Sequence, residues 1–107
     1  MKTDFLLTDK VIIITGATGV LGGAFADGIT QAGATVGILG RNGQIANERT
    51  QKIINKGGKA IALIADVTKE SDLIAARDLV LSTYGRIDGL VNAAGGNMPD
   101  AVVQPDQ

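Results

Sequence analysis

The sequence predicts an α/β fold, in which helices flank a parallel sheet of four strands. Two observations predict it. Four short apolar runs alternate with three longer helical patterns, and glycines stand where most of these patterns end. Strands that alternate with helices become parallel neighbours joined by right-handed crossovers. The expected strand order is 3-2-1-4, with a ligand at the switch point between the first and fourth strands.

The first half of the chain contains two strand–helix pairs. Residues 10–15 form a continuous β-branched run, typical of a strand that is buried on both faces. The following helix has apolar residues spaced by three and four and ends at Gly33, which we expect to be its left-handed cap. This predicted stripe comprises Leu21, Ala24, Phe25, Gly28, Ile29 and Ala32. The second strand spans 35–39, and a more polar helix covers about 44–56.

The second half repeats the pattern. The third strand spans 60–65, and Thr68 is expected to cap a helix that reaches Tyr84. Glu70 and Asp72 fall in the first turn of this helix, where the helix dipole favours negative charge. The helix carries apolar residues on more than one side. These are Leu73, Ile74, Leu79, Val80 and Leu81.

The fourth strand spans 87–91, and after Gly96 the pattern ends in a tail that holds both prolines. Because no repeat or linker divides the chain, we expect a single domain over residues 1–107. The fourth strand would form an open edge of the sheet.

Composition narrows the function classes. The net charge is -1, and Lys and Arg are spread singly, so no nucleic-acid partner is expected. Apolar runs are far shorter than the ~20 residues that a membrane span needs, and the N-terminus has no signal-peptide pattern. The absence of cysteine and histidine excludes disulfides and the commonest metal ligands. We therefore expect a cytoplasmic protein with no metal.

A glycine-rich turn, Thr15-Gly16-Ala17-Thr18-Gly19-Val20-Leu21-Gly22, separates the first strand from its helix. Such a turn lets backbone amides approach phosphates without interference from Cβ atoms, and the helix N-terminus adds unpaired N–H groups. In this context the turn predicts a site for the diphosphate of a dinucleotide. The predicted contacts are Gly16, Thr18, Gly19, Val20, Leu21 and Gly22. A turn that only packs the helix against the sheet is the alternative.

Three further motifs follow the later strands: Arg41-Asn42, Asp66-Val67 and the run from Leu90 to Gly95. In this order and spacing the four motifs resemble the N-terminal part of a short-chain dehydrogenase/reductase, over residues from about 10 to 95. The resemblance implies a Rossmann-type fold and NAD(P)-dependent oxidoreductase activity of the full-length protein. It also implies that the chain is truncated before strands 5 to 7.

The glycine spacing differs from the family's commonest form, which carries glycines at positions 16, 20 and 22. This chain has Gly16, Gly19 and Gly22, a spacing more usual in the extended and regulatory branches. Two other functions therefore stay open. One is a dinucleotide-binding sensor or regulatory module without catalysis, and the other is a sugar-nucleotide epimerase of the extended type.

The residues after the second strand predict the cofactor. NAD sites place a carboxylate there to bind the ribose 2′-hydroxyl, whereas an arginine accommodates the 2′-phosphate of NADP. Gly40 stands at the acidic position and is followed by Arg41 and Asn42. This favours NADP over NAD, because the guanidinium can bind the phosphate. A solvated arginine at a strand end is the alternative.

The resemblance implies roles for the remaining motif residues. Asp66 would bond the adenine amino group, with Val67 packed on the ring; an aspartate held by nearby amides ahead of the helix is the alternative. Asn92 would hold the sheet near the cofactor ribose. The small residues after it would leave space for the riboses. They are Ala93, Ala94 and Gly95.

No catalytic residue is assigned in this chain. The family uses a Ser, a Tyr and a Lys four residues after that Tyr, but Asp88 stands four residues after Tyr84, the one tyrosine here. We expect the catalytic group beyond Gln107 and the 107-residue chain alone to be inactive. The chain would be a segment of a longer enzyme, stabilised in a homo-oligomer or by its C-terminal part. The expected substrate is a small carbonyl or alcohol compound. The run from Ala94 to Asn97, followed by Pro99, resembles enzymes that reduce sugar-acid ketones of the mannonate/fructuronate and gluconate kind.

Overall fold

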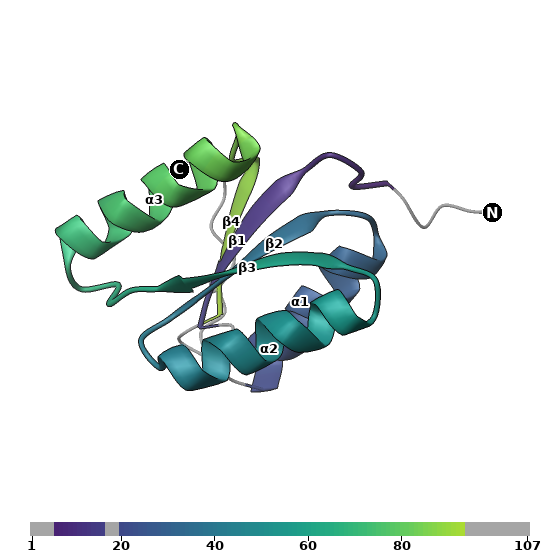
Figure 1. Cartoon of the computed structure of the whole chain (residues 1–107), viewed down its shortest axis with the longest axis horizontal. Coiled ribbons are helices and arrows are strands. Elements are labelled where there is room, and N and C mark those ends of the chain that lie inside the picture. The colour runs from purple at the N-terminus through teal and green to yellow at the C-terminus, as the bar shows by residue number, and fades with distance from the viewer. Residues whose placement is uncertain (1–5, 17–19, 94–107) are drawn as a thin grey trace.

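Four parallel strands form one sheet in the order β3-β2-β1-β4 (Figure 1). The strands are β1 (Val11–Thr15), β2 (Thr35–Gly40), β3 (Lys59–Ile64) and β4 (Gly89–Asn92). Between them lie α1 (Val20–Gln31), α2 (Gly43–Asn55) and α3 (Glu70–Tyr84). The computed structural model describes residues 6–16 and 20–93. The predicted α/β fold and its strand order are confirmed.

The register of the strands aligns the ends at which the sequence motifs lie. Thr15 of β1 pairs with Leu39 of β2 on one side and with Asn92 of β4 on the other. Leu39 in turn pairs with Leu63 of β3. These four residues form a row across the sheet close to the carboxyl ends of its strands. The segments that follow the four strands therefore lie close together at the carboxyl end of the sheet.

Helices cover the two faces of the sheet unequally: α1 and α2 lie on one face, and α3 lies on the other (Figure 1). The alternation along β1 separates its side chains, because Ile14 belongs to the core under α1 and α2 and Ile13 to the core under α3. The first core comprises Ile14, Ala26, Val36, Ile38, Ala46, Ile53 and Ala93. The second comprises Val11, Ile13, Leu39, Leu63, Ala65, Ala76 and Val80. Both faces of β1 are thus buried, as its continuous apolar run predicted.

The buried face of α1 matches the predicted stripe only in part, because Ile29 packs against the first core but other members do not. Three residues of that stripe are exposed, namely Ala24, Phe25 and Gly28. Among the described side chains of α1, the buried residues are Gly22, Gly23 and Ala26. Spacings of three and four fit either set, and alanine and glycine give little hydrophobic contrast between them. The small set faces inward because it allows close approach. A Cβ at residue 23 would collide with the guanidinium of Arg49, which reaches over from α2.

The start of α3 also differs from the prediction, because Thr68 does not cap it. The helix begins at Glu70, and its N-cap residue Lys69 makes no side-chain cap bond. Thr68 instead donates its backbone N–H (2.9 Å) and its hydroxyl (2.6 Å) to Oδ1 of Asp66. Asp66 and Thr68 thus form a turn ahead of the helix, in which an aspartate accepts the backbone N–H two residues later. The predicted end of the helix is confirmed at Gly85, whose φ is 81°.

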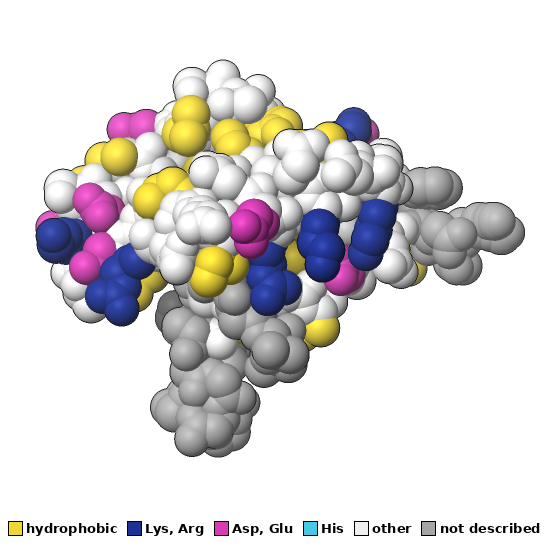
Figure 2. Space-filling view, turned by 60° about the horizontal axis from the view of Figure 1, so that its bottom comes forward, with side chains coloured by type: hydrophobic (Ala, Val, Ile, Leu, Met, Phe, Trp, Pro, Cys, Tyr) yellow, Lys and Arg dark blue, Asp and Glu magenta, His cyan; other side chains and the backbone are white. Residues whose placement is uncertain are grey.

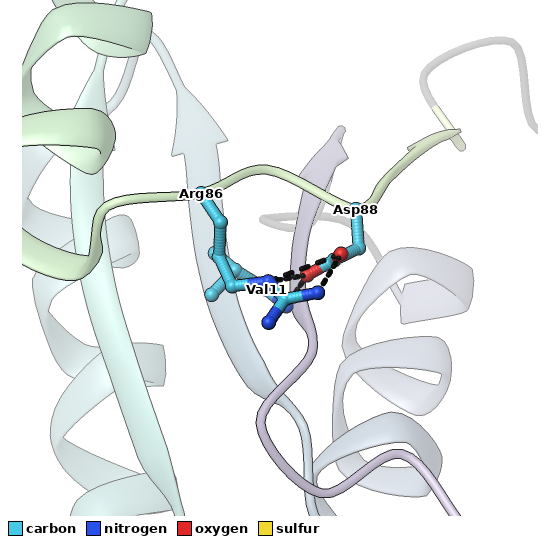
Figure 3. A network of polar contacts seen from close by, with 3 residues as sticks. All are labelled: Val11, Arg86 and Asp88. Atoms are coloured by element: carbon cyan, nitrogen blue, oxygen red, sulfur yellow. Dashed lines mark hydrogen bonds and ion pairs between the residues drawn. The ribbon is translucent and has the colours of Figure 1, made fainter.

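The fourth strand begins at Gly89, two residues later than predicted, because Asp88 makes a different connection to β1 (Figure 3). Its Oδ2 accepts the backbone N–H of Val11 at 2.8 Å, and Arg86 donates to both carboxylate oxygens. The hydrogen bonds from Arg86 and Val11 lower the pKa of Asp88. This contact fixes the amino end of β1 to the segment that enters β4.

Exposed apolar side chains are frequent on α3, as the sequence predicted. Leu73, Ile74, Leu79 and Leu81 are all exposed, whereas Ala76 and Val80 are the buried residues of this helix. The opposite side of the molecule, which Figure 2 brings forward, shows Lys and Arg side chains interspersed with Asp and Glu. None of the helices within the described residues combines the length and apolarity of a membrane span.

Candidate functional site

A pocket of about 290 Å³ opens at the carboxyl ends of β1, β2 and β3. It brings together four residues that the sequence placed in the cofactor site: Gly16, Arg41, Asp66 and Val67. The other lining residues are Leu39, Gly40, Ala65 and Thr68. The pocket lies on the edge of the sheet at which ligands bind in open parallel folds.

Gly16 forms the first step of the glycine turn. Its φ of 75° lies in the left-handed region, which favours glycine. Its N–H donates to the carbonyl of Leu39 at 3.2 Å, so the turn is tied to the end of β2. Gly22 is buried in the first turn of α1. Ala17 to Gly19, with the predicted contacts Thr18 and Gly19, and the side chains of Val20 and Leu21 lie outside the described part of the structure.

Arg41 and Asn42, which follow β2, have different roles in the structure. The Arg41 side chain is exposed and lines the pocket. Asn42 is the N-cap of α2, because its Oδ1 accepts the N–H of Ile45 at 3.1 Å. The capping bond restricts rotation of the Asn42 amide. A contact of Asn42 with the cofactor stays a prediction.

Asp66 carries the most connected carboxylate at the pocket. The hydrogen bonds from the hydroxyl and N–H of Thr68 lower its pKa, with smaller contributions from the charges of Arg41 and Lys69. Its own backbone N–H donates to Oδ2 of Asp72 at 2.8 Å. The carboxylate is thus ionised and held in place ahead of α3. This is the alternative role given for it above, and its predicted contact with adenine is still a prediction.

Asn92 is held by a partner that the sequence did not indicate. The hydroxyl of Thr15 donates to Oδ1 of Asn92 at 2.9 Å and so joins the carboxyl ends of β1 and β4. Thr15 is 8% exposed. Ala93 follows the strand, is buried, and donates its N–H to the carbonyl of Thr15 at 2.9 Å. A single hydroxyl at the end of an otherwise aliphatic strand is the signal that could have identified Thr15. Ala94 and Gly95 lie outside the described residues.

An apolar pocket of about 410 Å³ lies under α3, next to the Thr15–Asn92 contact. Its walls come from β1, β2, β4, α3 and the segments beside them. The apolar lining residues are Ile13, Leu39, Val67, Leu73, Ala76, Ile87 and Leu90. Leu39 and Val67 also line the 290 Å³ pocket, so the two hollows share a wall.

Metal ligands do not gather in the described part of the chain: no three Asp or Glu side chains there are placed to hold an ion. The polar side chains that line the two pockets include the guanidinium groups of Arg41 and Arg77, the carboxylate of Asp66 and the amide of Asn92. Such groups suit a ligand that carries phosphates, hydroxyls and a heterocyclic base.

Several known proteins are similar to this chain in sequence and in fold. The family model of the short chain dehydrogenases matches residues 10–106. The 7alpha-hydroxysteroid dehydrogenase of Escherichia coli (strain K12) is 38% identical over 99 residues, which are 92% of this chain and 39% of that protein.

Solved structures of related proteins have the same fold as this chain. A crystal structure from Haemophilus influenza with bound NAD, provisionally named a D-mannonate oxidoreductase, superposes with a TM-score of 0.80 at 35% identity, covering 87% of this chain and 33% of that one. L-Sorbose reductase from Gluconobacter frateurii, complexed with NADPH and L-sorbose, gives 0.78 at 29% identity, covering 83% and 34%. The chain therefore spans 33–39% of the length of these relatives. With its family model matched along nearly the whole sequence, the chain belongs to the short-chain dehydrogenase family.

Proposed function

We propose that the carboxyl edge of this sheet binds a nicotinamide dinucleotide, NADP in preference to NAD. The observation that carries the proposal is the pocket that joins Gly16, Arg41, Asp66 and Val67 from the ends of three strands. The residues fit the group. Gly16 has a left-handed backbone conformation, in which a residue with a Cβ would be strained. The N-terminus of α1 follows the turn and would offer backbone N–H groups to the diphosphate.

The preference for NADP rests on the end of β2. Gly40 offers no carboxylate to the ribose, and the exposed guanidinium of Arg41 stands at the rim of the pocket. Asn92, oriented by Thr15, would keep β4 in register beside the nicotinamide half of the cofactor. A bound nicotinamide would supply hydride exchange with a carbon atom of the substrate. The role proposed for the described residues of this chain is to bind the cofactor and orient it.

For the full-length protein we propose an oxidoreductase that interconverts a small carbonyl compound and its alcohol in the cytoplasm. The proposed substrate is a sugar-acid ketone. Its support is the motif from Ala94 to Asn97 with Pro99, together with the similarity to the Haemophilus influenza structure. We expect the apolar side chains of α3 and the 410 Å³ pocket to be covered in the full-length protein or its homo-oligomer.

Calorimetric titration of the purified chain with NADPH and with NADH tests the site. The wild-type chain should bind NADPH more tightly. Arg41→Ala should weaken NADPH by about 1–3 kcal/mol, the loss of a charged hydrogen bond, and should change NADH little. Lys56→Ala, which removes a positive charge at the other end of α2, is the matched control and should change neither.

Each part of the proposal can fail separately. If the chain is folded by circular dichroism and binds neither dinucleotide, the cofactor site is wrong. If NADH binds as tightly as NADPH, or if Arg41→Ala weakens both equally, the site stands and the argument for NADP is refuted.

A further inference from the structure

A second hollow of about 230 Å³ adjoins the proposed site at the ends of β2 and β3. It is lined by Arg41, Ile64, Ala65, Asp66 and Asp72. One guanidinium therefore shares this space with two carboxylates, which come from the end of β3 and from the first turn of α3. The pattern of cofactor motifs identified Arg41 and Asp66 but gave Asp72 no role beyond the helix dipole.

Hydrogen bonds hold both carboxylates in place. Oδ2 of Asp72 accepts the backbone N–H of Asp66 at 2.8 Å, and Oδ1 of Asp66 accepts both donors of Thr68. Asp72 is half-buried, so solvent reaches it from one side. The charge of Arg41 is felt at Asp66, where it helps to lower the pKa of the carboxyl group. Asp72 lines the same hollow as this pair of opposite charges.

This arrangement of charges should affect the binding of NADP and of NAD differently. A ribose 2′-phosphate carries about two negative charges at neutral pH. If it binds Arg41, it also enters the field of Asp66 and Asp72, within the ~10 Å over which charges interact at moderate salt. The 2′-hydroxyl of NAD is neutral and does not experience this repulsion. Arg41 thus attracts the phosphate while the two carboxylates oppose it.

We propose that Asp72 is a specificity-determining residue, which limits the preference of this site for NADP and keeps it open to NAD. The proposal rests on the cofactor site proposed above. Asp66 already has a proposed contact with adenine, so Asp72 is the carboxylate whose charge can be removed without loss of a cofactor contact.

Asp72→Asn tests the role of the charge. The amide oxygen of asparagine can still accept the N–H of Asp66, so the loop before α3 should keep its shape. The dissociation constant of NADPH should fall about threefold to tenfold at ~50 mM salt, and that of NADH should stay within about twofold. The gain for NADPH should disappear at ~500 mM salt, because the repulsion is screened. Asp78→Asn, an exposed aspartate of the same helix paired with Arg77, is the control and should leave both constants unchanged.

The outcomes separate this inference from the one it rests on. An unchanged ratio of the two constants, an equal gain for both dinucleotides, or a gain that persists at high salt would each overturn the role of Asp72. A merely structural role would move the melting temperature and both constants together. Failure of wild type and variant to bind either dinucleotide, while both show a cooperative thermal melt, would refute the proposed site itself.

Discussion

Replacing Ile13 or Ile14 by alanine should destabilise the protein by different amounts, although the two residues are adjacent in β1. Ile14 is 0% exposed and lies in the core that α1 and α2 cover. Ile13 is 6% exposed and borders the 410 Å³ pocket under α3. The same three carbon atoms are removed in both variants. The comparison therefore isolates how well each face of the sheet is closed.

The expected magnitudes follow from two contributions. Loss of three buried carbon groups costs about 2.4 kcal/mol at ~0.8 kcal/mol each, and this applies to both residues. At Ile14 the void is enclosed, and a residual cavity of roughly 60 Å³ adds about 1.4 kcal/mol. At Ile13 the void merges with an existing hollow, so the second contribution is small. We expect about 4 kcal/mol for Ile14→Ala and about 2.5 kcal/mol for Ile13→Ala.

Urea denaturation followed by circular dichroism measures both values. The corresponding shifts in melting temperature should differ by roughly 5–10 °C for a domain of this size. If Ile14→Ala leaves too little folded protein, the Ile→Val pair should give the same ranking, with about 1.4 against about 0.8 kcal/mol. Equal costs, or a larger cost at Ile13, would refute the reasoning, because the α3 face would then be as closed as the other.

Two further predictions concern glycines and pH. Gly28→Ala should raise the free energy of unfolding by about 0.5–1 kcal/mol, since nothing lies within 4 Å of the added Cβ and alanine is the better helix former. Gly37→Ala should lower it by about 1–3 kcal/mol, because its Cβ would lie 2.8 Å from a leucine side chain of β3; thermal melts that show the same sign for both would contradict this. The pKa of Asp88 is lowered from 3.8 by Arg86 and Val11, so its charge stabilises the fold fully above about pH 4 and less as the pH falls through the folded-state pKa. The difference in melting temperature between wild type and Asp88→Asn should therefore shrink on acidification below that pH, and a difference that stays constant from neutral to acid pH would disprove it.

Signals local to the sequence were sufficient for the strand order and for the position of the main motifs. The β-branched run before Gly16 and the glycines that end the helices mark the element boundaries. Since the carboxyl ends of neighbouring parallel strands lie at one end of the sheet, the sequence pattern predicts that Arg41 and Asp66 lie near each other. The 290 Å³ pocket confirms that they lie together.

Details that depend on competition between partners could not be predicted in the same way. Thr68 was expected to accept an N–H at the start of α3, but it precedes the N-cap residue Lys69 and donates to the carboxylate of Asp66. Asn42 was assigned to the cofactor, yet it also satisfies an N–H at the start of α2. The partner of Asn92 is Thr15, 77 residues earlier in the chain. Only the register of β1 against β4 brings these two together.

The guanidinium that lies over Gly23 makes positions 23 and 49 a coupled pair. A side chain introduced at 23 must displace Arg49 or force α1 away from α2, because the space is already occupied. α1 begins directly after the glycine turn, so a shift of this helix would carry the proposed diphosphate site with it. A side chain at 23 therefore depends on whether the Arg49 guanidinium can take another position. A larger residue at 23 becomes compatible with this helix pairing when a shorter one replaces Arg49.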